Sequence, residues 1–213
     1  MKQLLVILLF FLVGLALAQG ITYFNQQQNR VLSSKHSNAT GFSLGNAPSE
    51  SLQGKVASLS GTVNWLSRVA IKTAPLIISQ SLQQGEEVST DTNGKVAIQI
   101  KNIVYLSMAP NSHINFIQLL PINFVIMQES GSVTYQDSGS GVLSIRTFDL
   151  VTVVNKGVIT IAINKDSNSV TVTALRGTIQ EGYVDSQNMS TVINITAGQK
   201  FIFDITNKQG TVQ

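Results

Sequence analysis

The fold is decided by one stretch of the chain, Lys95-Val96-Ala97-Ile98-Gln99-Ile100-Lys101. Val96, Ile98 and Ile100 alternate with polar or small residues, so an extended chain here has one apolar face. The stretch follows Asp91-Thr92-Asn93-Gly94, in which the Asn-Gly pair favours a tight hairpin turn. These two features predict a half-buried strand that enters the domain from a turn.

The same two-residue period extends toward the C-terminus. β-branched residues are frequent, and turn residues separate one apolar run from the next. The strongest runs are 122–127, 142–145, 148–154, 158–163, 169–175, 178–184, 191–195 and 200–205. No amphipathic helical period occurs after residue 54. We therefore predict an all-β fold of about ten to twelve short strands, arranged as a β-helix-like roll or a β-sandwich.

The N-terminal segment, residues 1–24, predicts export or anchoring. Lys2 precedes fifteen consecutive apolar residues, Leu4 to Ala18. Cleavage after Ala18 would make this segment a signal peptide. Continuation to residue 24 would make residues 4–24 an apolar helix that anchors the protein in a membrane. Both alternatives predict an extracytoplasmic protein, either secreted or periplasmic after cleavage, or single-pass with its C-terminal domain outside.

Composition divides the remainder of the chain. Residues 25–53 are rich in Asn, Gln, Ser and Gly, which predicts a flexible polar linker. Residues 54–205 form the predicted β domain, and residues 206–213 form a C-terminal tail. Only 12% of the chain is charged and the net charge is +3, which argues against a nucleic-acid partner. The lack of Cys excludes a disulfide scaffold, a thiolate metal site and a Cys nucleophile.

Short motifs follow one another in a fixed order along the β region. They are Gly54-Lys55-Val56, Gly61-Thr62-Val63, Leu82-Gln83-Gln84-Gly85, Thr90-Asp91, Pro110-Asn111-Ser112, Gly177-Thr178-Ile179 and Gly198-Gln199. In this order they resemble the FecR domain, the extracytoplasmic β domain of bacterial iron-transport signalling regulators. The resemblance covers residues 54–204. It implies an all-β fold and a role in binding or cell-surface signalling rather than catalysis.

The sequence departs from that family in two places. Lys101-Asn102 stands where the family has an Asp-Gly turn. Regulators of the family also carry a cytoplasmic, sigma-factor-binding domain before their membrane helix, whereas only three residues precede the apolar segment here. The resemblance therefore applies to the extracytoplasmic module alone.

A search for catalytic residues identifies no convincing set. Glu86 and Glu87 are adjacent, so on a strand they point to opposite faces. His113 lacks a metal-binding or catalytic motif around it, and Trp65 shares a face with Val63, which favours a packing role. We predict a non-enzymatic protein without cofactor or metal that binds a protein or an envelope polysaccharide. A carbohydrate-active β-helical enzyme and a self-assembling surface protein are the alternatives.

Overall fold

The computed structural model describes residue 47 and residues 49–213, which contain strands and no helix. The all-β prediction is confirmed. The predicted N-terminal segment 1–24 and most of the predicted linker 25–53 lie outside the described residues. No helix within the described part of the chain has the length and apolarity needed to cross a membrane.

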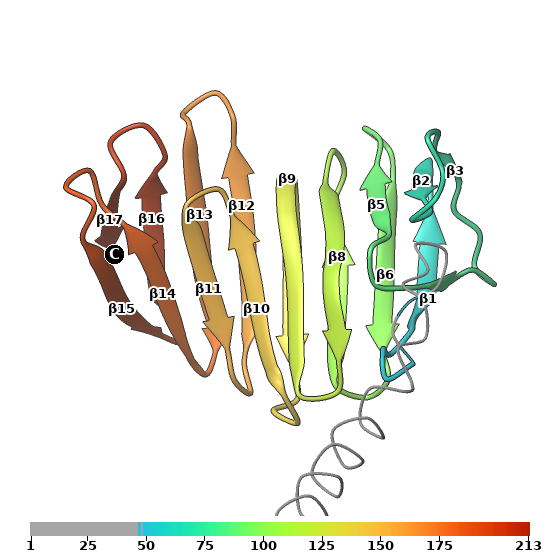
Figure 1. The fold of residues 1–213 in the computed structure, drawn as a ribbon. Coiled ribbons are helices and arrows are strands. Elements are labelled where there is room, and N and C mark those ends of the chain that lie inside the picture. Colours follow the sequence, from blue (N-terminus) through green and yellow to red (C-terminus); the bar gives the residue numbers. More distant parts are fainter. Residues whose placement is uncertain (1–46, 48) are drawn as a thin grey trace, which may run out of the picture. The chain divides into compact units, whose positions relative to one another are not determined.

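The strands form two hydrogen-bonded layers. Sheet A has the order β4 (Ser81–Leu82), β1 (Gly54–Ser60), β6 (Lys95–Ile100), β7 (Val104–Met108), β9 (Asn123–Asp137), β12 (Val158–Asn164), β13 (Ser169–Arg176), β16 (Lys200–Asp204) and β17 (Gln209–Val212). Sheet B has the order β3 (Ala74–Pro75), β2 (Val63–Leu66), β5 (Glu87–Thr90), β8 (His113–Leu120), β9, β10 (Val142–Thr147), β11 (Leu150–Val154), β14 (Thr178–Val184) and β15 (Ser190–Thr196). In Figure 1 the two layers run from β1–β3 at one end to β15–β17 at the other.

The long strand β9 belongs to both sheets. Its first half pairs with β8 and β10 in sheet B, and its second half pairs with β7 and β12 in sheet A. Gly131 lies at the crossing with a φ of 78°, and a side chain there would collide with Ser112. Glycine tolerates both the positive φ and the close approach, so it allows one strand to pass from one layer to the other.

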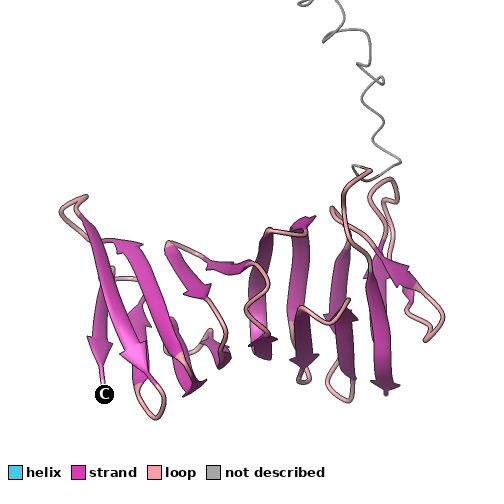
Figure 2. Cartoon of the chain, turned by 90° about the horizontal axis from the view of Figure 1, so that it is seen from below, coloured by secondary structure: helices cyan, strands magenta, loops and turns pink. Residues whose placement is uncertain are grey.

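Two layers connected in this way are a sandwich-like arrangement rather than a β-helix. Apart from the parallel pair β9–β10, neighbouring strands of the described residues pair antiparallel, and after β9 the chain alternates between the sheets as hairpins. Short turns and loops join these strands in Figure 2. Residues 49–213 form seventeen strands, more than the ten to twelve predicted. Two of them, β3 and β4, have only two residues each and so no apolar period to detect.

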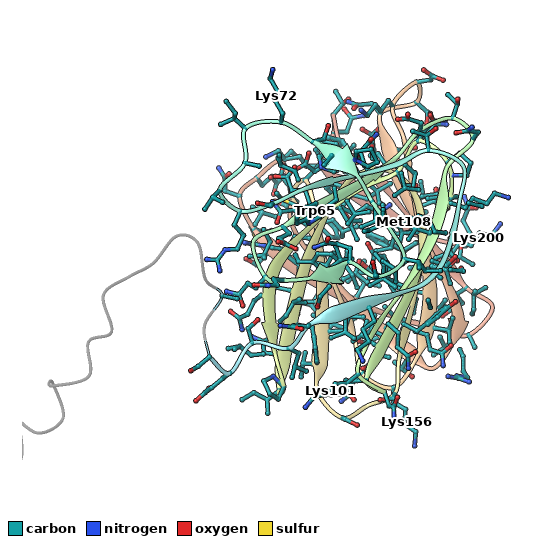
Figure 3. All side chains as sticks on the ribbon, turned by 90° about the vertical axis from the view of Figure 1, so that its right-hand side faces the viewer. Trp65, Lys72, Lys101, Met108, Lys156 and Lys200 are labelled. Atoms are coloured by element: carbon teal, nitrogen blue, oxygen red, sulfur yellow. The ribbon has the colours of Figure 1, made fainter. Side chains whose placement is uncertain are left out.

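The core lies between the layers, where side chains fill the space in Figure 3. Val96, Ile98 and Ile100 of β6 are buried there, so the predicted face of the deciding strand is confirmed. Ala97 is buried as well, which breaks the strict alternation. Alternate residues of facing strands supply the remaining core, as a sandwich requires.

Regular structure continues beyond the predicted limits of the domain. β17 pairs with β16, so the segment 206–213 contributes the edge strand of sheet A rather than a separate tail. Leu52 is buried in the core, and its N–H donates to the Leu119 carbonyl at 2.7 Å. The β6–β7 turn also forms despite its unusual residues, with Lys101 at a φ of 46°.

Candidate functional site

The residues of the family-like motifs lie at structural positions in turns and in the core. Thr90 and Ser112 are buried, and the Thr90 Oγ1 donates to the Ala109 carbonyl at 2.7 Å and accepts from the Ser112 N–H at 2.9 Å. The Ser112 Oγ in turn donates to the Ser132 carbonyl at 3.1 Å and accepts from the Ser132 N–H at 3.0 Å. These bonds join β5, the 109–112 turn and β9, so these two side chains hold the fold together.

The neighbouring motif residues have similar roles. The Asp91 carbonyl accepts from the N–H groups of Gly94 and Asn111, and Asn111 has a φ of 58° in the turn that begins at Pro110. Leu82 is fully buried in the core. The remaining motif positions are glycines at strand starts or turns and one turn-bonding glutamine: Gly54, Gly61, Gly85, Gly177, Gly198 and Gln199.

Glu86 and Glu87 point to opposite faces of sheet B, as predicted. Glu86 is buried, and its Oε2 accepts from the Trp65 Nε1 at 3.0 Å and from the Gln83 N–H at 2.8 Å. Trp65 packs against the core from its rim, which confirms the packing role. Glu87, the next residue along the chain, faces outward and contacts His113 of the neighbouring strand β8.

A charged cluster formed by Glu87, His113 and Glu129 lies on the outer side of sheet B. The His113 Nε2 is 3.0 Å from the Glu87 Oε2, and its Nδ1 is 3.2 Å from the Glu129 Oε2. Each ionised carboxylate can only accept a hydrogen bond, so both contacts are satisfied together only when the imidazole is doubly protonated. The sequence shows His113 without these partners, because strand pairing rather than sequence spacing brings the two glutamates to it.

Beside this cluster lies an open pocket of about 570 Å³ between the rims of the two sheets. Its apolar lining comes from Met127, Phe148, Ile163 and Ile205, and its polar lining from Gln128, Glu129, Lys165 and Asn168. Glu129 belongs to both the charged cluster and the pocket. An apolar cavity with a few charged groups at its margin is the usual form of a binding site.

Phe148 is the most unusual residue of this pocket. It is 57% exposed and has a φ of 53° in the two-residue turn between β10 and β11. A positive φ is unfavourable for a bulky side chain, and exposure gives no burial energy in return. The mostly apolar run 148–154 predicts a strand that includes residue 148, whereas β11 begins at Leu150. The turn is held by an ion pair between the Asp149 Oδ2 and the Lys208 Nζ at 3.0 Å.

Two acidic residues are buried elsewhere in the β domain. The Asp137 Oδ2 accepts from the N–H groups of Gly139 and Lys156, at 3.2 and 2.7 Å, so this residue joins two loops rather than facing solvent. Glu181 is fully buried on the inner face of β14, and its Oε2 accepts from the Thr152 Oγ1 at 2.7 Å. Burial raises the pKa of Glu181 to about 8.

The acidic and histidine side chains described above do not form a metal-binding site. Within residues 47 and 49–213, no group of three or more His, Asp or Glu side chains is arranged to hold a metal ion. The strongest candidate site is therefore the combination of the pocket with the charged cluster at its margin.

Comparison with known proteins gives a likeness of fold. No protein-family model and no curated protein sequence matches the chain. Among solved structures, two crystal structures described as a "putative anti-sigma factor" from Parabacteroides distasonis ATCC 8503 each align with a TM-score of 0.51, at 10% and 11% sequence identity. Each alignment covers 60% of this chain and 58% of the other, so this chain matches little more than half the length of those structures. At this identity the match shows a shared fold.

Proposed function

We propose that this protein is an exported or membrane-anchored FecR-like module that binds a protein or an envelope component and acts in cell-surface signalling, without catalysis. The observation that carries the proposal is the fold shared with the two structures described as a "putative anti-sigma factor". The motif order of the FecR domain agrees with it, since the motif residues lie at turns and core contacts that this fold needs.

Binding is assigned to the pocket and the charged cluster. An exposed aromatic side chain held in an unfavourable conformation is poor for stability, which argues that Phe148 serves recognition. Ile163 and Ile205 extend the apolar surface below it, and Glu129 and Lys165 provide one negative and one positive group at the margin. This arrangement suits a partner that inserts an apolar group flanked by polar atoms.

The experiment combines deletion of the gene with complementation by the full chain. Signalling predicts a change in the transcripts of a defined set of genes, which the wild-type chain restores and Phe148→Gly does not. Ile122→Gly is the matched control, because Ile122 is also an exposed apolar turn residue, 76% exposed, and it does not line the pocket. Restoration by Phe148→Gly as complete as that by Ile122→Gly would show that the pocket is not the recognition surface.

An assay with purified protein, read together with the transcripts of the deletion strain, tests the carbohydrate-active alternative. A non-enzymatic module leaves envelope polysaccharide unchanged, so purified full chain incubated with it releases no reducing sugar ends. Release of such ends, with no transcript change on deletion, would replace the signalling proposal by the enzymatic one.

A further inference from the structure

The two ends of the sandwich differ in how their edge strands are protected. At the N-terminal end the edges are β3 and β4, which have two residues each, and β3 contains Pro75. Proline removes an N–H donor, and short edges offer few free backbone groups to another chain. This protection is partial, because β4 pairs with β1 only at Gly54 and Lys55.

The C-terminal edge of sheet B lacks that protection. β15 runs for seven residues, Ser190 to Thr196, and within the described residues it pairs with β14 alone. It contains no charged residue and no proline, and Val192 at its middle is 62% exposed. A long, uncharged edge strand with unpaired N–H and C=O groups is a template for another strand.

We propose that β15 pairs antiparallel with β15 of a second copy of this chain, about a two-fold axis through Ile193. Ile193 then faces Ile193 of the second copy, and Val192 faces the position of Asn194. This axis is perpendicular to the sheet. Residues that face the core in one copy therefore lie beside residues that face the core in the other, and the two B sheets form one continuous sheet.

The occupant follows from the chemistry of the strand itself. Like charges opposite each other destabilise a strand pair. β15 contains no charged residue, so two copies of it can pair without such repulsion. Ile193 packs only partly against the core, and a second Ile193 beside it would extend that apolar contact across the axis. This inference does not depend on the proposed signalling role, because it uses only the edge of sheet B.

The register can be tested by disulfide formation, since the full chain contains no Cys. Ile193→Cys places two thiols directly opposite each other across the axis, within the distance that a disulfide needs. Val192→Cys faces position 194 of the other copy, so two identical thiols lie diagonally, about 7–8 Å apart, beyond disulfide reach. We expect covalent dimer from Ile193→Cys alone and from a mixture of Val192→Cys with Asn194→Cys, and none from Val192→Cys alone.

Solution mass supplies the second test. Wild-type protein should sediment at twice the mass of its own single chain, and the double variant Val192→Lys with Asn194→Lys should halve that mass by opposing like charges. The control is Val142→Lys with Gln99→Lys, which adds the same two charges to exposed positions on β10 and β6, away from β15. A wild-type monomer at all concentrations, or a dimer that survives the edge lysines and gives no Ile193→Cys cross-link, would overturn the proposal.

Discussion

Glu181 should make the stability of this protein fall as the pH rises through neutrality. The carboxyl lies on the inner face of β14. Among the residues that the structure describes, only the Thr152 hydroxyl bonds it, through Oε2, and Oε1 has no partner there. Burial without compensating charge favours the neutral acid, and the pKa rises from 4.5 to about 8. The folded protein therefore retains a proton that the unfolded chain has already lost between these two values.

The size of the effect follows from proton linkage. Because the native state binds the extra proton, the free energy of unfolding decreases with rising pH from 4.5 to about 8, by at most ~1.4 kcal/mol per pH unit. Integrated from pH 5.5 to 8.0, the loss is about 3 kcal/mol, a large part of a typical domain's stability of ~5–15 kcal/mol. Glu181→Gln keeps the shape of the side chain and removes its titration.

The assay is urea unfolding at pH 5.5 and pH 8.0, followed by the fluorescence of Trp65, the only tryptophan. Wild type should lose about 3 kcal/mol more than Glu181→Gln between the two conditions. All other titratable groups are common to both proteins, so the difference isolates Glu181. Equal losses in the two proteins would refute the reasoning.

Three further perturbations test the turn, the buried network and the charged cluster. Phe148→Gly should raise the free energy of unfolding by about 1 kcal/mol, because glycine accepts the positive φ that costs phenylalanine more; a lower urea midpoint would contradict this. Thr90→Val should destabilise by ~2–4 kcal/mol, since it leaves the Ser112 N–H and the Ala109 carbonyl without the hydroxyl they bond. Thermal unfolding measures it, and a shift of the unfolding temperature within error of zero would show that water replaces the hydroxyl. His113→Ala should cost less than ~1 kcal/mol at pH 7, because its contacts with the two glutamates are partly exposed, with side-chain exposures of 30–43%; a larger cost in the same unfolding assay would assign the cluster a structural role.

The described residues confirm the fold class that the sequence predicts, but the sequence leaves the candidate site unpredicted. Val96, Ile98 and Ile100 are buried because a two-residue period on an extended chain can hide only one face. The placement of Phe148 was wrong, because an apolar side chain in a turn looks the same in sequence as the first residue of a strand. The charged cluster was missed for a different reason: Glu87, His113 and Glu129 come from three strands, and only their register makes them neighbours.

The sequence by itself determines extended structure, because alternation and turn residues act over a few neighbouring positions. Which strands become neighbours is decided only in the tertiary structure. The passage of β9 from one sheet to the other at Gly131 shows this, since a glycine among polar residues carries no local sign that the chain changes layers there. The polar residues beside Glu181 in the sequence would suit an exposed strand. Packing between distant strands buries this side chain instead, and the burial raises the pKa of its carboxyl.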